Sequence, residues 1–149
     1  MNRTEFEALR DLLDKKIRQD IRLSPGRGHL HSFVAEDIPI ENSENIDARI
    51  TVTFNPDRDA KIINVHVPGL GPICRLCVDG AAHRPFGRSH KHSLQTERCP
   101  ERNLPDGVVD MPTLSGQSLD EVFREFCRMA NIVHEGALIV PPEATGGVP

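Results

Sequence analysis

Residues 73–92 form a short stretch that is rich in side chains suited to acid–base, metal-binding or phosphate-binding chemistry. The stretch reads ICRLCVDGAAHRPFGRSHKH and contains two cysteines, three histidines and four arginine or lysine residues. Cysteine and histidine are preferred ligands of zinc, and histidine also exchanges protons near neutral pH. The stretch therefore supports three interpretations: a zinc site, a metal-free active site, or a solvated basic loop in which the histidines are incidental.

A zinc site would start from Cys74 and Cys77, because their Cys-x-x-Cys spacing suits two ligands of one tetrahedral ion. Cys99 and either His90 or His92 would complete the four ligands. The aliphatic run around Cys74 and Cys77 also fits a strand, and side chains alternate between the two faces of a strand. The two thiols would then point to opposite faces and could not share an ion. A zinc-stabilised regulatory domain is therefore kept as an alternative function, and no cofactor is otherwise expected.

The metal-free interpretation uses the histidines for general acid–base catalysis. RNA cleavage without a metal needs one group to take the proton of the 2′-hydroxyl and another to protonate the leaving 5′-oxygen, and histidine serves both near neutral pH. We predict His83, His90 and His92 for these roles. Fixed cations must also stabilise the negative charge that builds up on phosphorus, and we predict Arg75 and Lys91 for this role.

Substrate contacts are predicted in the loop that precedes His90. Arg84 and Arg88 would bind phosphates, and Phe86 would stack on a base. The formal net charge of the chain is −4, so RNA binding has to come from this local basic patch rather than from a global positive field. The residues leave open whether the protein is an enzyme, with endoribonuclease as the candidate activity, or a non-enzymatic phage or mobile-element module that blocks a host partner.

The runs CRLCVDGAAHRPFGRSHKH and FREFCRMANI resemble a loosely related set of small bacterial proteins. This set includes the TumE-like toxins of type II toxin–antitoxin pairs and an uncharacterised family found around mobile elements. The resemblance extends in outline over residues 46–133 and is carried by Arg75, Asp79, Gly80, His83, Pro85, His90, Lys91, His92, Asn131 and Ile132. It implies an RNA-acting toxin that inhibits translation and is neutralised by a cognate antitoxin protein. Cys77 departs from the acidic or amide residue expected there, and the insert at 99–116 is longer than expected.

Two helices are predicted around this stretch. The first covers residues 4–21, because Thr4 and Glu7 form a capping-box signature and an apolar stripe follows at helical spacing, formed by Phe6, Leu9, Leu13 and Ile17. The second begins at Ser118, which forms a capping box with Glu121. Its apolar stripe is formed by Leu119, Val122, Phe123, Phe126, Cys127 and Ala130, so that Cys127 is interpreted as a buried core thiol.

Strands are predicted between the two helices, at 29–35, 45–55, 61–67, 73–78 and 90–95, and a last short strand at 136–140. Residues 45–55 alternate strictly between apolar and polar side chains and are joined to 61–67 by a polar turn, which indicates an antiparallel hairpin. On the strand at 61–67, His66 shares a face with Ile62 and Asn64. It is interpreted as a half-buried, hydrogen-bonded histidine, with contact to a ligand on that face as the alternative.

The order of these elements predicts an α+β fold, with an N-terminal helix, an antiparallel sheet of about four to five strands, a C-terminal helix and a short last strand. We expect residues 1–140 to form a single domain and residues 141–149 to be a disordered tail. No apolar run approaches the 18 or so residues of a membrane span, so we expect a cytoplasmic protein with reduced cysteines and no membrane partner.

Overall fold

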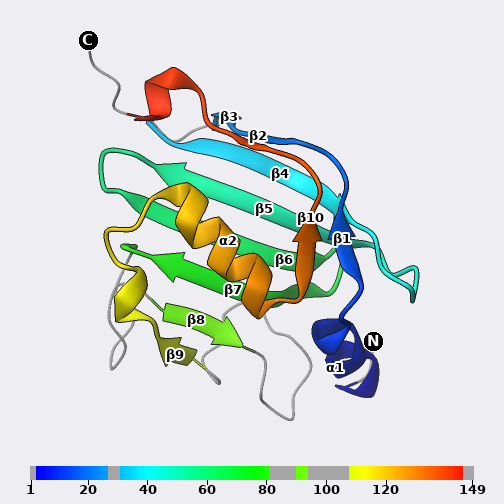
Figure 1. The fold of residues 1–149 in the computed structure, drawn as a ribbon. Coiled ribbons are helices and arrows are strands. Elements are labelled where there is room, and N and C mark those ends of the chain that lie inside the picture. Colours follow the sequence, from blue (N-terminus) through cyan, green and yellow to red (C-terminus); the bar gives the residue numbers. More distant parts are fainter. Residues whose placement is uncertain (1–2, 27–30, 81–89, 94–107, 146–149) are drawn as a thin grey trace.

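The computed structural model describes residues 3–26, 31–80, 90–93 and 108–145 of the chain (Figure 1). The backbone alone is described at a few of these positions, among them residues 90–93 and 108–110. The predicted residues His83, Arg84, Phe86, Arg88 and Cys99 lie outside the described residues.

The centre of the fold is a seven-stranded antiparallel sheet in the order β3-β4-β5-β6-β7-β8-β9. Its strands are β3 (Ser24–Pro25), β4 (Phe33–Ile40), β5 (Ala48–Asn55), β6 (Ala60–Val67), β7 (Gly71–Val78), β8 (His90–Ser93) and β9 (Val108–Asp110). The prediction of an α+β fold is confirmed, with five antiparallel strands, β4 to β8, and a short strand added at each edge. The predicted hairpin of residues 45–67 is confirmed as β5 and β6.

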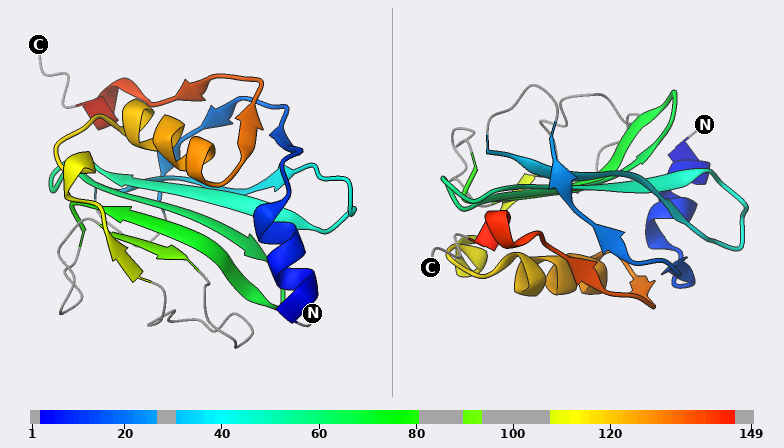
Figure 2. Two further views of the ribbon diagram at one scale, coloured as in Figure 1. Left: turned by 60° about the horizontal axis from the view of Figure 1, so that its bottom comes forward. Right: turned by 90° about the horizontal axis from the view of Figure 1, so that it is seen from above.

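Helix α2 (Leu119–Met129) lies across one face of the sheet (Figures 1 and 2). The predicted capping box is present, because the backbone amide of Glu121 donates to the Ser118 hydroxyl and the backbone amide of Ser118 donates to the Glu121 carboxylate. Each residue of the predicted apolar stripe is buried: Leu119, Val122, Phe123, Phe126, Cys127 and Ala130. This amphipathic helix therefore closes the hydrophobic core against the sheet.

The prediction of one long N-terminal helix is wrong beyond its first turns. Helix α1 covers only Arg3–Asp11, and Leu13, predicted to lie on its apolar stripe, is 79% exposed. The chain then forms β1 (Lys15–Ile17) and β2 (Ile21–Arg22), which pair in parallel with β10 (Ile132–His134) and β11 (Leu138–Ile139). Ile17 and Ile21 are four residues apart, a spacing that fits a helix equally well, and only the pairing with a distant segment makes them strand residues.

Two short 3₁₀ helices complete the fold: η1 (Pro112–Leu114) precedes α2, and η2 (Pro142–Thr145) follows β11. Residues 142–145 of the predicted disordered tail form the helix η2, and its Ala144, only 1% exposed, packs against the core. The strand predicted at 29–35 overlaps β4 at residues 33–35 only, because β4 begins at Phe33 and continues to Ile40. None of the described helices is long and apolar enough to cross a membrane.

The two faces of the sheet differ in character, and the right-hand view of Figure 2 shows α2 on one of them. The face toward α2, here called the near face, carries buried aliphatic residues, among them Ile50, Val52, Ile63, Val65 and Leu76. The opposite face, here called the far face, carries Arg49, Thr51, Asn64, His66, Arg75 and Cys77, which alternate with the near-face residues along the same strands.

Candidate functional site

The two cysteines of the Cys-x-x-Cys stretch lie on opposite faces of the sheet. Cys74 pairs with Val65 on the near face, whereas Cys77 pairs with Ile62 on the far face. Burial raises the pKa of the Cys77 thiol, and the nearby Arg75 guanidinium lowers it by a smaller amount. Because the two sulfur atoms are separated by the sheet itself, the proposed zinc set of Cys74, Cys77, Cys99 and a histidine is incompatible with this strand.

Strand β8 brings two of the predicted histidine positions next to β7. His92 is the register partner of Arg75, and His90 is the register partner of Cys77. Directly opposed residues of an antiparallel pair share one face of the sheet, so positions 90 and 92 have the phase of the far face. Lys91 has the opposite phase, because its register partner is Leu76. The register thus joins Arg75 with the two histidine positions and separates Lys91 from them.

A polar row crosses the far face from β5 to β8. Thr51 pairs with Asn64, Asn64 pairs with Arg75, and Arg75 pairs with His92. Side chains directly opposite one another on adjacent strands lie about 5 Å apart at Cβ, so such a row forms one continuous surface strip. His66 lies two residues beyond Asn64 on β6 and therefore borders the same strip.

Three polar atoms beside this row are shielded from solvent and have no hydrogen-bond partner: Asn64 Oδ1, His66 Nδ1 and Arg75 Nε. Among the described residues the one further atom of this kind is Lys61 Nζ on the near face, which has an ion-pair partner in Asp59. An unsatisfied buried polar group costs about 1–3 kcal/mol, and most such groups in folded proteins are bound to a partner, water or ligand. The far face thus gathers one acceptor, one donor and one imidazole nitrogen that each require a partner.

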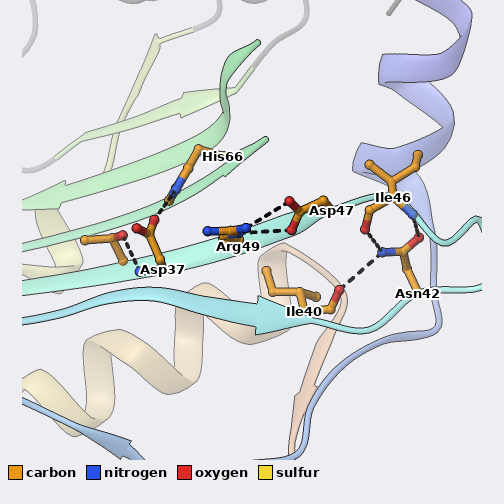
Figure 3. Close-up of polar contacts among 8 residues, drawn as sticks. Asp37, Ile40, Asn42, Ile46, Asp47, Arg49 and His66 are labelled. Atoms are coloured by element: carbon orange, nitrogen blue, oxygen red, sulfur yellow. Dashed lines mark hydrogen bonds and ion pairs between the residues drawn. The ribbon is translucent and has the colours of Figure 1, made fainter. Parts of the chain in front are cut away.

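His66 is held from its other ring nitrogen by Asp37, as Figure 3 shows. Nε2 lies 2.8 Å from Asp37 Oδ1, and the histidine side chain is 20% exposed. Asp37 reaches this position because β4 has one extra residue between Ala35 and Ile38 relative to β5. The extra residue forms a β-bulge, which changes the phase of the strand and turns Asp37 toward His66.

The backbone of Asp37 is in the left-handed region, with φ 55°. This conformation costs about 1 kcal/mol or more for a residue with a side chain, although aspartate tolerates it better than most. The amide of Asp37 donates to Thr51 Oγ1 at 3.2 Å, which compensates one ladder hydrogen bond that the bulge removes. Strained backbone of this kind occurs preferentially at functional sites.

A second ion pair adjoins the Asp37–His66 pair on the same face (Figure 3). Arg49, the register partner of His66, donates through Nε and Nη2 to the two carboxylate oxygens of Asp47, each at 3.0 Å. These bonds lower the pKa of Asp47 and raise that of Arg49. Asn42 holds the preceding loop in place, because its side chain bonds to the backbone of Ile46 in both directions.

Sequence reasoning identified part of this site. Strand alternation placed Asn64 and His66 on one face, as observed, but His66 was interpreted as a histidine with its hydrogen bonds satisfied, whereas its Nδ1 lacks a partner. Asp37 was missed, because strict alternation does not reveal which residue of a strand is the bulged one. The signal that could have found it is the acidic pair Glu36–Asp37 inside an otherwise apolar strand.

A cleft of about 500 Å³ lies on the other side of the molecule, between α2 and the segment that follows it. Its polar side chains have partners within the fold. Arg124 pairs with Asp120 at 2.7 Å, and His134 Nε2 lies 2.8 Å from the carbonyl oxygen of Gln19. The far face is the stronger candidate site, because three of its buried polar atoms lack hydrogen-bond partners.

No protein-family model matches the chain, and neither a curated protein nor a solved structure matches it. The resemblance to TumE-like toxins therefore stays a prediction from sequence. The case for a function depends on the residues of the far face.

Proposed function

We propose that the protein is a metal-independent endoribonuclease that binds and cleaves RNA on the far face of its sheet. The observation that carries the proposal is the cluster of unsatisfied polar atoms around Arg75, together with the register that pairs Arg75 with His92. A cation, an amide oxygen and imidazoles on one sheet face are the groups that a phosphodiester and its neighbouring 2′-hydroxyl require.

Arg75 would bind the scissile phosphate. Its guanidinium keeps its charge at any physiological pH and presents donors in a fork that matches two phosphate oxygens. The charge on those oxygens increases in the transition state, so Arg75 would bind that state more strongly than the substrate. His90 and His92 would supply acid–base chemistry next to it. The roles predicted for His83, Arg84, Arg88 and Phe86 rest on the sequence alone. Lys91 has no role in this proposal, because its register partner is Leu76 and its position has the phase of the near face.

The biological setting of the proposal comes from the resemblance to TumE-like toxins. It includes inhibition of translation through RNA cleavage, and a cognate antitoxin protein that neutralises the activity. A non-enzymatic binding module would use the same face to hold RNA without cleaving it. Product analysis separates these two functions, because only the enzyme leaves new RNA ends.

The test is an RNA-cleavage assay of the purified chain in EDTA. We expect products with 2′,3′-cyclic phosphate and 5′-hydroxyl ends. His92→Ala and Arg75→Ala should each lower the rate at least about 100-fold, the usual contribution of a general acid–base group or a transition-state cation. His31→Ala and Arg124→Ala are the matched controls, because both side chains are exposed and lie away from the polar row.

Two results would contradict the proposal. One is cleavage that survives His90→Ala, His92→Ala and Arg75→Ala unchanged, which would point to a contaminating nuclease. The other is tight RNA binding that weakens steeply with salt and shows no turnover, which would favour the binding module.

A further inference from the structure

We propose that His66 is the general base of this site and that Asp37 is the residue that positions it. This inference rests on the proposed ribonuclease function and adds to it two residues from β4 and β6. The hydrogen bond between Asp37 Oδ1 and His66 Nε2, 2.8 Å long, provides the first observation. The unpartnered Nδ1 of the same ring provides the second.

The carboxylate of Asp37 determines which ring nitrogen carries the proton. A carboxylate accepts hydrogen bonds and does not donate them when ionised, so Nε2 must be the protonated nitrogen of the neutral ring. Nδ1 then carries a free lone pair and can accept a proton. A carboxylate bonded to the far nitrogen also stabilises the imidazolium that forms when Nδ1 takes that proton.

The backbone supports a positioning role for Asp37. Strand β4 has an extra residue at this point, and Asp37 has a left-handed φ of 55°. A regular strand has neither feature, and together they direct the carboxylate toward His66. The Thr51 hydroxyl accepts the Asp37 amide, which fixes the bulge from the neighbouring strand. Three strands are thus arranged around a single imidazole, through Asp37 on β4, Thr51 on β5 and His66 on β6.

His66 and His92 lie on either side of Arg75. From the spacing of strands and residues, two strands across and two residues along, positions 66 and 92 are about 12 Å apart at Cα. This separation leaves room for a phosphate at Arg75 between the two positions. Less than 1 Å² of Nδ1 is accessible, so the proposed role requires that neighbouring side chains shift before a substrate hydroxyl can reach this nitrogen.

The reaction then balances without a further reactant. His66 Nδ1 takes the proton of the 2′-hydroxyl as the 2′-oxygen forms its bond to phosphorus. The bond between phosphorus and the 5′-oxygen breaks, and the 5′-oxygen receives a proton from the imidazolium of His92. The products are a 2′,3′-cyclic phosphate and a 5′-hydroxyl, and Arg75 stays charged throughout.

The charged groups around His66 supply a matched control. Asp37 faces it from β4 and Arg49 faces it from β5. Arg75 lies on β7, opposite Asn64, which is two residues from His66 on β6. Asp47 is a second carboxylate near His66. The pKa of Asp47 is lowered mainly by its hydrogen bonds to Arg49 and to a smaller extent by His66. Asp37→Asn and Asp47→Asn therefore remove the same charge from the same neighbourhood. Only Asp37→Asn replaces the carboxylate bonded to His66, and the amide that takes its place can donate to Nε2 as well as accept from it.

The experiment compares steady-state cleavage of RNA by wild type, His66→Gln, Asp37→Asn and Asp47→Asn. We expect kcat to fall at least about 100-fold for His66→Gln and Asp37→Asn with KM changed less than about threefold, and about wild-type values for Asp47→Asn. Asparagine tolerates the left-handed backbone, so Asp37→Asn should keep its fold, as checked by circular dichroism. Nitrogen-15 NMR of the imidazole should find the proton on Nε2 in wild type and lose this preference in Asp37→Asn.

The outcomes separate this inference from the proposed function. Full activity of His66→Gln in a chain that cleaves RNA would overturn the inference and leave the ribonuclease standing. Equal losses in Asp37→Asn and Asp47→Asn, or a proton on Nδ1 in wild type, would overturn the positioning role. A wild-type chain that cleaves no RNA would overturn the proposed function, and the inference would fall with it.

Discussion

Asp79 joins the end of β7 to residues 115–116, which lie between η1 and α2. Its replacement tests how much this link stabilises the fold. The residue follows β7 with φ 54°, and its carboxylate accepts hydrogen bonds from the Ser115 hydroxyl and, at 2.8 Å, from the Gly116 amide. It also lies 3.7 Å from the ammonium of Lys61, which is 0% exposed. Lys61 has a second anion at 2.8 Å, Asp59. Asp79→Ala removes these three contacts at once.

The expected cost of Asp79→Ala follows from these contacts. Each of the two hydrogen bonds lies at the surface and contributes about 1 kcal/mol. Removal of one anion from a buried ammonium adds a further 1–2 kcal/mol or so, because Asp59 still compensates part of the charge. The free energy of unfolding should therefore fall by about 3 kcal/mol, a large fraction of the 5–15 kcal/mol or so that is typical of a domain.

Urea unfolding followed by far-ultraviolet circular dichroism measures this change, since the chain has no Trp or Tyr for fluorescence. With a slope of about 2 kcal/mol per molar urea, the midpoint should fall by about 1.5 M. Asp57→Ala is the control, because its carboxylate is 61% exposed and lies 3.8 Å from His31. Loss of such an exposed pair should cost less than about 0.5 kcal/mol.

Lys61→Met in the Asp79→Ala background tests the cause of the loss. Methionine removes the buried ammonium and keeps most of its packing volume, so it should restore part of the stability. A midpoint for Asp79→Ala that equals that of Asp57→Ala would refute the reasoning. A double variant that is less stable than Asp79→Ala would show that the lysine stabilises the fold by itself.

Two further predictions follow from two buried groups, Lys15 on β1 and Cys127 on α2. Burial lowers the pKa of Lys15 from 10.5. At pH values between the folded-state pKa and 10.5 the unfolded chain binds more protons than the folded chain, so the free energy of unfolding rises with pH. Lys15→Met should flatten this rise in urea titrations between pH 8 and 10.5, and an unchanged slope would contradict the prediction. Burial raises the pKa of Cys127 to about 12, so iodoacetamide at pH 8 should modify this thiol about 1000-fold more slowly in the native than in the unfolded chain, as measured by peptide mass spectrometry. Equal rates in the two states would show that the thiol is accessible.

Local patterns were sufficient where one segment carries its own signal. The alternation of residues 45–55 predicted β5, and the Ser118–Glu121 capping box predicted the start of α2. The same alternation predicted that Cys74 and Cys77 lie on opposite faces, which removes the zinc site that their spacing suggests. These features depend on residues a few positions apart, which is the range over which helix and strand periods are readable.

Long-range contacts decided the rest of the fold. Residues 15–22 have apolar spacing that fits a helix, but β1 and β2 form because β10 and β11, more than a hundred residues later in the sequence, pair with them. A backbone segment follows the partner that satisfies its hydrogen bonds, and periodicity within the segment does not show where that partner is.

The candidate site shows the same division. The sequence by itself determined that Arg75, His90 and His92 have side chains suited to phosphate binding and acid–base catalysis. It also determined that Asn64 and His66 share a face. Only the tertiary structure decided that Arg75 pairs with both Asn64 and His92, since register between strands depends on how the whole sheet assembles. It also decided that a bulge turns Asp37 toward His66, because one extra residue reverses the phase of a strand without changing its composition.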